Sequence, residues 1–477
     1  MRRRSTARSI GFVLSAALAL GLAASAAPAR RAAANVDWTR FGFTASRTGV
    51  GPSSTGITRA NVASLRRKQI QLDGTVDSSP IYLHAVTIGG ARHDALFVTT
   101  TYGRTEAIDA TSGAVLWRFT PPGFSSWAGS YRITTATPVA DPSRAWIYAA
   151  SPDGMIQKLS VADGRAAWRT RVTLLPEREK IAAALNYWKG RVLVATGGYV
   201  GDAPPYQGHV AVLDARSGRL LRVWNSLCSD RHALQQPSTC PKSDSAIWGR
   251  AGVVVDPASG DLLVATGNGA WDGRTYWGDS MLKLSPDAAR LLGNWTPANE
   301  AELDSGDVDL GSTSPALVGG RYLVQGGKDG KLRLLSLRRP NGTASAGQRK
   351  GGELQTVTAP GGTDVFTAPA VSGTLVFVAT NAGTGAWQLR SGRLHALWSN
   401  ASAGTSPVVA GGLLYIYDPN GGLRVYVPRS GKLVATLPAG SGHWNSPIVV
   451  AGRIVLPEGD ANDHAQSGVL DVYSARA

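Results

Sequence analysis

A short phrase recurs along this chain and constrains its fold more than any other feature. It consists of a strand, a turn of small residues that ends in glycine, and a second short strand that closes on Trp or Leu. Repetition at about 40 to 50 residues is typical of stacked supersecondary units, so the chain is expected to fold as an array. The clearest copies are Ala107 to Trp117, Lys158 to Trp168, Val212 to Trp224, Gln388 to Trp398 and Val425 to Leu437.

Each unit contains short runs rich in β-branched and aromatic residues, such as Val376 to Ala379 and Leu413 to Tyr417. Runs of this kind, bounded by Gly, Asn and Asp, are typical of strands. The chain also has 57 Gly and 26 Pro, which fits many tight turns. Each unit is therefore expected to be a small antiparallel sheet.

Eight units can be counted, and the last ends without room for a fourth strand. Ala63 to Leu72 supplies a strand-like segment ahead of the first unit, and pairing it with Gly468 to Tyr473 would remove an exposed edge. We therefore predict an all-β fold, an eight-bladed β-propeller of four-stranded antiparallel blades closed by the N-terminal strand. The expected units are 78–121, 132–172, 181–224, 246–297, 310–358, 365–400, 406–439 and 444–473.

The first residues have the layout of a secretory signal. Four arginines precede an apolar run from Ile10 to about Ala24, and Ala24-Ser25-Ala26 offers a cleavage site. The run is too short and too weakly apolar for a membrane span. We expect a signal peptide at 1–26, a lead-in segment at 27–62, a propeller at 63–477 and no transmembrane segment in the mature chain. The protein is predicted to be exported, to the periplasm or the cell exterior.

Charge and cysteine usage narrow the function further. The formal net charge is +16, but the basic residues are spread through turns without clustered aromatics, so the sequence does not favour nucleic-acid binding. A cationic exterior facing anionic envelope polymers is the simpler interpretation. The only cysteines, Cys228 and Cys240, share one polar insertion, which predicts a disulfide in an oxidising compartment. Neither Cys-x-x-Cys nor a haem-attachment motif is present.

Two other classes of enzyme are disfavoured. The seven histidines are scattered without metal-ligand spacing, and the Gly-x-Ser-x-Gly phrase of serine hydrolases is absent. Gly431-Lys432 lacks the upstream glycine of a phosphate-binding loop. The sequence therefore gives no support to a hydrolase or a nucleotide-binding protein.

The repeated phrase Ala-x-Asp-x-x-x-Gly-x-x-x-Trp resembles the blade-ending motif of the pyrroloquinoline-quinone (PQQ) repeat, or quinoprotein alcohol dehydrogenase-like, propellers. The likeness extends over nearly all of residues 36–477 and is sharpest from Trp248 to Gly330. There it implies that Trp248 stacks on the quinone, Asn268 ligates calcium, Asp309 is the catalytic base and Lys328 is a basic residue at the quinone oxygens. Asp202 is the candidate in place of a calcium-binding glutamate.

The chemistry implied by the resemblance suits these residue types. An indole gives a planar quinone an apolar floor, and Asn and Asp provide the oxygen ligands that calcium prefers. A carboxylate such as Asp309 can accept an alcohol proton as hydride leaves, and the ammonium of Lys328 offsets charge that develops on the reduced ring. The cofactor would carry the redox chemistry.

Each of these residues also has a purely structural interpretation. Asn268-Gly269 is a common sequence for a hairpin turn, and Asp329-Gly330 places Lys328 beside another turn. Trp248 fits a packing aromatic, as is expected for most of the 14 Trp. Asp309 belongs to an acidic stretch that also fits a solvated loop.

Two functions follow from the resemblance. The first is an exported oxidoreductase of alcohol-type substrates that uses PQQ and calcium and passes electrons to a separate acceptor. The second is a non-enzymatic envelope scaffold that binds other proteins, like the propeller subunit that assembles outer-membrane proteins. The order of Trp248, Asn268, Asp309 and Lys328 favours the first. Thr100-Thr101, where active dehydrogenases of the family carry adjacent cysteines, favours the second.

Overall fold

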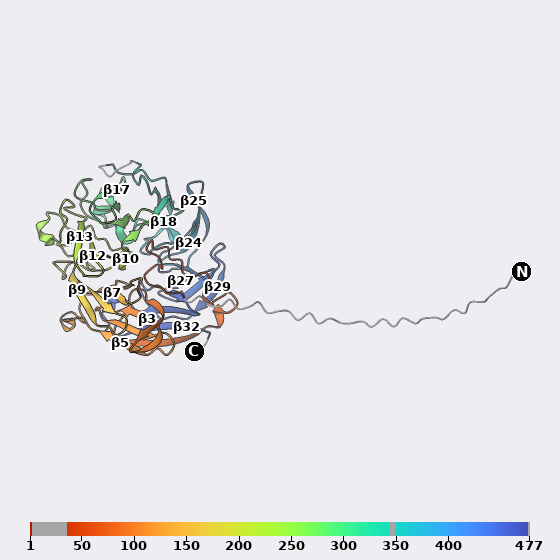
Figure 1. The fold of residues 1–477 in the computed structure, drawn as a ribbon. Coiled ribbons are helices and arrows are strands. Elements are labelled where there is room, and N and C mark those ends of the chain that lie inside the picture. Colours follow the sequence, from red (N-terminus) through yellow and green to blue (C-terminus); the bar gives the residue numbers. More distant parts are fainter. Residues whose placement is uncertain (2–35, 343–348, 476–477) are drawn as a thin grey trace. The chain divides into compact units, whose positions relative to one another are not determined.

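The protein forms a ring of eight four-stranded antiparallel sheets (Figure 1). The computed structural model describes Met1, residues 36–342 and residues 349–475. The predicted eight-bladed propeller is therefore confirmed, whereas the expected signal peptide, apart from Met1, lies outside the described residues. No helix in the described part of the chain is long and apolar enough to cross a membrane.

Seven blades are built from consecutive strands. Blade 1 comprises β2 (Ile81–Ile88), β3 (Ala91–Thr99), β4 (Thr105–Asp109) and β5 (Val115–Phe119), and blade 2 comprises β6 (Val139–Ala140), β7 (Trp146–Ser151), β8 (Met155–Ser160) and β9 (Ala166–Arg171). Blade 3 comprises β10 (Asn186–Trp188), β11 (Arg191–Ala195), β12 (His209–Asp214) and β13 (Leu220–Asn225), and blade 4 comprises β14 (Val254–Val255), β15 (Leu262–Ala265), β16 (Met281–Leu284) and β17 (Leu291–Trp295). Blade 5 comprises β18 (Ala316–Val318), β19 (Tyr322–Gln325), β20 (Lys331–Ser336) and β21 (Gln355–Thr358). Blade 6 comprises β22 (Ala370–Ser372), β23 (Leu375–Ala379), β24 (Thr384–Arg390) and β25 (Arg393–Asn400). Blade 7 comprises β26 (Val408–Ala410), β27 (Leu413–Asp418), β28 (Gly422–Tyr426) and β29 (Leu433–Leu437).

Helical structure among the described residues is confined to short connections. They are α1 (Glu300–Ser305) and the 3-10 turns η1 (Val62–Ser64), η2 (Phe124–Ser126), η3 (Pro237–Thr239), η4 (Leu310–Ser312), η5 (Pro360–Gly362) and η6 (Ala461–Asp463).

Blade 8 closes the ring with strands from both ends of the chain. It contains β30 (Ile448–Val450), β31 (Arg453–Glu458), β32 (Gly468–Ser474) and β1 (Arg66–Leu72). β1 pairs antiparallel with β32, from Arg66 opposite Ser474 to Leu72 opposite Gly468. The predicted pairing of the N-terminal segment is confirmed, and the edge that β32 would otherwise expose is covered.

The recurring sequence motif joins adjacent blades at three of the blade boundaries. In blade 1 the turn at Gly113 adopts a φ of 75°, and the strand after it carries Trp117. The indole lies against Gly164 of blade 2, where an added Cβ would come within 2.6 Å of the ring, and its Nε1 donates to the carbonyl of Val161 at 2.9 Å. The same contact joins Trp168 to Gly218 and Trp398 to Gly431. These glycines therefore provide both the turn conformation and the space for the neighbouring tryptophan.

The first strand of each blade lines the central channel, because the first strands of several adjacent blades contact one another. The lead-in segment runs across one end of these strands. Its backbone carbonyls accept hydrogen bonds from the first strands of blades 2, 4, 6 and 7, and it forms an isolated bridge to blade 1. The pairs are Thr39 with Ala140, Ala45 with Val255, Thr48 with Val371, Gly49 with Val409, and Trp38 with Tyr82. This end of the channel is covered.

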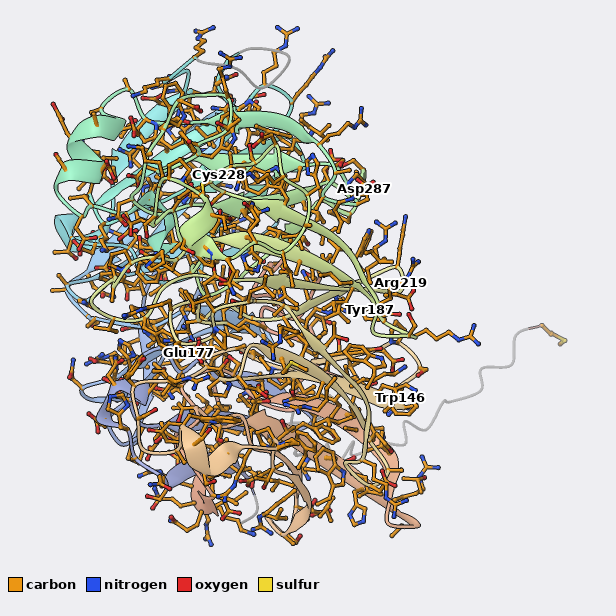
Figure 2. All side chains as sticks on the ribbon, turned by 90° about the vertical axis from the view of Figure 1, so that its left-hand side faces the viewer. Trp146, Glu177, Tyr187, Arg219, Cys228 and Asp287 are labelled. Atoms are coloured by element: carbon orange, nitrogen blue, oxygen red, sulfur yellow. A yellow bond between two sulfur atoms is a disulfide. The ribbon has the colours of Figure 1, made fainter. Side chains whose placement is uncertain are left out.

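The two ends of the channel can be told apart in side view. In Figure 2, Glu177 lies toward one face, and Tyr187 and Trp146 lie toward the other. Tyr187 belongs to the covered face, because its carbonyl accepts a hydrogen bond from Arg40 of the lead-in segment at 2.7 Å.

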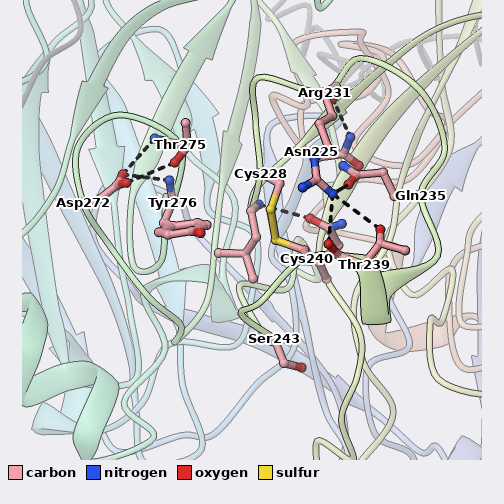
Figure 3. The surroundings of a disulfide bond; sticks show 12 residues. Asn225, Cys228, Arg231, Gln235, Thr239, Cys240, Ser243, Asp272, Thr275 and Tyr276 are labelled. Carbon is pink, nitrogen blue, oxygen red and sulfur yellow. Dashed lines mark hydrogen bonds between the residues drawn. A yellow bond between two sulfur atoms is a disulfide. The ribbon is translucent and has the colours of Figure 1, made fainter.

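The insertion between blades 3 and 4 carries the disulfide (Figure 3). Cys228 and Cys240 are bonded, as predicted, and pack against Leu227 and Tyr276. Asn225 holds the same loop by donating to the carbonyls of Arg231 and Ala233. The crosslink closes a loop twelve residues long, which limits the freedom of the unfolded chain.

The closing strand supports a stability prediction. Ile70 of β1 is 6% exposed and packs in the core shared by blades 1, 7 and 8, whereas the adjacent Gln71 is exposed. We expect Ile70→Ala to lower the free energy of unfolding by about 2–4 kcal/mol. Gln71→Ala should change it by less than about 0.5 kcal/mol. Urea unfolding of both variants measures the difference, and equal small effects would contradict the closing role of β1.

Candidate functional site

A cavity of about 350 Å³ lies on the channel axis. Its walls come from the segments that lead into the first strands of the blades, at the end away from the lead-in segment. In six blades the residue four positions before the first strand lines it: Asp77, Thr135, Ala182, Arg250, Phe366 and Trp444. The fold therefore brings together side chains that are far apart in the sequence.

Arg250 reaches from blade 4 across the axis. Its Nη1 donates to Thr135 Oγ1 at 3.1 Å, and its Nη2 donates to the carbonyls of Asp77 at 2.9 Å and Thr135 at 3.2 Å. The side chain is buried, and burial lowers its pKa to about 10. The guanidinium therefore ties blade 4 to blades 1 and 2 beside the cavity.

Three of the predicted site residues meet in this cavity. Lys328 Nζ forms an ion pair with Asp309 Oδ2, and it lies 5.7 Å from the centre of a Trp248 ring. Trp248 Nε1 lies 3.5 Å from Asp309 Oδ1. Lys328 also donates to Asp307, at 3.1 Å to both its carbonyl and Oδ1. The group combines an aromatic face, a buried carboxylate and an ammonium.

The two charges of this group influence each other. Burial raises the pKa of Asp309, against the opposing effect of the Lys328 ammonium. Burial lowers the pKa of Lys328, but the carboxylates of Asp309 and Asp307 outweigh it and raise that pKa above its ordinary value. Lys328 therefore stays protonated at neutral pH.

Asn268 meets Asp309 through its backbone. Its N–H donates to Asp309 Oδ1 at 3.0 Å, but Asn268 is not among the residues that line the cavity. The hairpin-turn interpretation of Asn268-Gly269 is wrong, because the connection from β15 to β16 spans residues 266–280 and Asn268 does not have the positive φ of a type I′ turn. Gly267 allows the approach, since a Cβ there would lie 1.9 Å from Asp309 Oδ1.

Asp202 lines the exposed rim of the cavity and accepts a hydrogen bond from Tyr206 Oη at 2.7 Å. Further carboxylates lie behind it. Burial, together with the charges of Asp202 and Asp304, raises the pKa of Asp244. Burial also raises the pKa of Asp279 to about 8, and its buried Oδ2 has no partner among the described residues. This side of the cavity therefore concentrates carboxyl groups, and burial together with their mutual repulsion favours protonation of those behind the rim.

A second polar cluster on the cavity wall was not predicted. Asp77, His443 and Asp460 each place one ligand-type atom within 4.8 Å of the others. His443 Nδ1 lies 2.9 Å from Asp77 Oδ2 and 3.3 Å from Asp460 Oδ1. Burial acts to raise the pKa of Asp77, but its hydrogen bond and electrostatic interaction with His443, together with the charge of Arg250, hold that pKa below its ordinary value.

Aromatic rings connect the two clusters. Phe366 lies 6.0 Å from Trp248 and 5.2 Å from Trp444, and the His443 ring lies 4.2 Å from Trp444, measured between ring centres. Flat apolar surface therefore runs between the Asp309 side and the Asp77 side.

The sequence does contain a signal that could have identified the cavity-lining residues that were not predicted. Four of them lie three residues before a proline that precedes a first strand: Asp77 before Pro80, Thr135 before Pro138, Phe366 before Pro369, and Trp444 before Pro447. Aligning the units on this proline would have placed them on the axis. In contrast, Thr100 to Gly103, compared above with the adjacent cysteines of the dehydrogenases, does not line the cavity.

The Asp309–Lys328 pair supports a prediction about stability. Lys328→Met leaves the Asp309 carboxylate buried without its cation, so we expect the free energy of unfolding at pH 7 to fall by about 2–4 kcal/mol. Removal of the ammonium raises the pKa of Asp309 further, so the carboxyl of the variant takes up a proton as the pH falls toward about 4. The difference in unfolding free energy between the variant and the wild-type protein should therefore shrink over that range. Urea unfolding at both pH values measures this.

Two further variants complete that test. Lys331→Met removes an exposed charge from the first residue of β20, three residues after Lys328, and should change stability by less than about 0.5 kcal/mol. Combining Asp309→Asn with Lys328→Met should restore most of the loss. A deficit that does not depend on pH would contradict the assignment of the penalty to Asp309.

Known proteins resemble the chain in sequence and in fold. It is 26% identical over 304 residues to quinohemoprotein alcohol dehydrogenase ADH IIB of Pseudomonas putida, covering 58% of this chain and 41% of that protein. It is 24% identical over 217 residues to polyvinylalcohol dehydrogenase of a Sphingopyxis species, covering 43% and 32%. The matches therefore cover less than half of the length of these relatives.

Solved structures share the fold. Quinohemoprotein alcohol dehydrogenase from Comamonas testosteroni superposes with a TM-score of 0.69 at 16% identity, over 94% of this chain and 81% of that one. BamB from Moraxella catarrhalis gives a TM-score of 0.53 at 15% identity, over 86% and 97%. Identities this low show the fold alone.

A family model described as outer membrane protein assembly factor BamB matches residues 69–232 and 270–436, more than half of the chain. The protein therefore belongs to the PQQ-repeat β-propeller family, which is related to the quinoprotein alcohol dehydrogenases and to BamB.

Proposed function

We propose that this protein is an exported oxidoreductase that uses PQQ and calcium to oxidise alcohol-type substrates and passes the electrons to a separate acceptor. The observation that carries the proposal is the meeting of Trp248, Asp309 and Lys328 in one cavity. A propeller that needs these residues only for its own turns has no reason to gather them.

The cavity suits a flat, anionic quinone. Its volume of about 350 Å³ lies within the range of small-molecule sites. The rings of Trp248, Phe366 and Trp444 offer aromatic surface, and three cationic side chains, Lys180, Arg250 and Lys328, also line the cavity. The residues present therefore fit PQQ, which is planar and carries three carboxylates.

The acidic side of the cavity suits a divalent cation. Asp309 and Asp202 line the cavity on this side. Behind them, burial raises the pKa of Asp244, and the negative charges of Asp202 and Asp304 add to that effect. Hard cations such as calcium prefer oxygen ligands, so Asp309, Asp202 and the side chain of Asn268 are the proposed ligands.

The side chains divide the remaining work. Bound PQQ would supply the two-electron acceptor and calcium the Lewis acid that protein groups lack. Trp248 would support the ring through its face, and Lys328 would donate hydrogen bonds toward the quinone oxygens. Asp309 would accept the hydroxyl proton of the alcohol, a role helped by the burial that raises its pKa.

A scaffold function is the second candidate. The description of the matching family model and the structural likeness to BamB favour it. In that case the cavity would have no need of PQQ, and the loops at the rims would bind envelope proteins.

Cofactor binding separates the two candidates. We expect purified protein mixed with PQQ and calcium chloride to retain quinone absorbance on desalting, and to lose it when calcium is chelated. Trp248→Ala should weaken retention about tenfold or more, because the indole supplies the ring floor. Trp146→Ala, on the opposite face in Figure 2, is the matched control. Failure of the wild-type protein to retain PQQ would favour the scaffold.

Asp309→Asn then tests the proton acceptor. The change preserves shape and removes the base, so PQQ should still bind while alcohol oxidation falls by about a hundredfold or more. An unchanged oxidation rate would rule out the role proposed for Asp309.

A further inference from the structure

Two cations in the cavity lack a carboxylate partner. Lys180 and Arg250 both line it, and neither forms an ion pair within 4.0 Å with any described residue. Lys328, in contrast, is paired with Asp309 and Asp307. The positive charges of Lys180 and Arg250 therefore face the cavity without direct neutralisation.

Arg250 is held by neutral acceptors. Its two terminal nitrogens donate to Thr135 and to the backbone carbonyl of Asp77, and its buried Nε has no partner among the described residues. Neutral acceptors fix the guanidinium without cancelling its charge. The ring of Trp444 lies 5.6 Å from it, so an apolar wall stands beside the charge.

The ammonium of Lys180 donates no hydrogen bond to any residue that the structure describes. Its backbone is fixed by exchange of hydrogen bonds with Gly197 at 2.6 and 2.9 Å. Burial, followed by the charge of Arg250, lowers its pKa to about 8, although Asp77 and Asp460 act in the opposite direction. Lys180 is half-buried, and an ammonium with limited access to water and without a partner is costly, so an anion in the cavity would reduce that cost.

The nearby carboxylates are already engaged. Asp77 Oδ1 accepts the N–H of Trp444 at 2.7 Å, and its Oδ2 accepts from Ala461 at 3.2 Å and faces His443. Asp460 Oδ1 accepts the N–H of Asn462 at 2.8 Å and lies near the same histidine. These groups reduce the net positive charge but do not occupy Lys180 or Arg250.

We propose that Lys180 and Arg250 form a carboxylate-binding subsite in the cavity. A monoanion suits it better than phosphate, because the carboxylates of Asp77, Asp202, Asp307 and Asp309 line the same space and repel a more highly charged ion. The carboxylate belongs either to the quinone or to a hydroxycarboxylic acid substrate. Both of these uses rest on the proposed function, whereas carboxylate binding by Lys180 and Arg250 does not.

Binding measurements test the subsite without turnover. Glycolate and its neutral counterpart ethylene glycol are titrated calorimetrically into the full-length mature protein, with inorganic phosphate as a third probe. We expect glycolate to bind at least about tenfold more tightly than either, because charge-assisted hydrogen bonds require the carboxylate. Its affinity should fall between pH 7 and pH 9 as Lys180 loses its proton. Equal binding of glycolate and ethylene glycol, or tighter binding of phosphate, would overturn the proposal.

Three variants locate the effect. Lys180→Met should weaken glycolate binding about tenfold or more and abolish its pH dependence, and Lys180→Arg should restore affinity without that dependence. Lys189→Met removes an exposed charge from the same blade and should change nothing. If Lys180→Met binds glycolate as the wild-type protein does, the subsite is wrong. Circular dichroism confirms that each variant is folded.

PQQ identifies the source of the carboxylate. If PQQ displaces glycolate and Lys180→Met weakens PQQ retention, the subsite holds the cofactor. If PQQ and glycolate bind together and Lys180→Met affects only glycolate, the subsite holds a substrate. Glycolate binding by a protein that never retains PQQ would uphold the subsite and refute the proposed function.

Discussion

The contact between a tryptophan of one blade and a glycine of the next underlies the rest of this structure. A single blade buries little on its own, and the ring becomes stable only when adjacent sheets pack face to face. Trp117 on Gly164, Trp168 on Gly218 and Trp398 on Gly431 repeat one geometry. Any side chain on these glycines would meet the indole, so the contact sets how neighbouring blades approach.

The ring in turn defines the site. First strands converge on the axis, and the segments that precede them carry the cavity residues. The lead-in segment covers the other end of the channel, so the cavity lies at the end that this segment leaves uncovered. Arg250 adds a charged bridge between blades 4, 1 and 2. Its position combines a structural role with the charge that a carboxylate ligand would use.

Charge is distributed unevenly inside this pocket. On one side Asp309 is paired with Lys328, with further carboxylates behind it; on the other, Lys180 and Arg250 have no carboxylate partner. Aromatic rings lie between the two sides. This distribution of charge favours a flat ligand whose negative charge lies toward Lys180 and Arg250. The carboxylates at its other end would favour a metal cation beside the same ligand. A scaffold has no evident use for it.

The sequence by itself determined the repeat, the number of blades, the closing strand and the disulfide, because each depends on local strand and turn patterns or on the only two cysteines. It also indicated Trp248, Asp309 and Lys328 as a group, through the resemblance of one continuous region. Only the tertiary structure decided that Asp77, Lys180, Arg250 and His443 share their cavity. These residues lie in different blades, and no local pattern fixes distances across the axis. It also decided that Asn268 meets Asp309 through its backbone, because the conformation of the 266–280 loop depends on packing against blade 5.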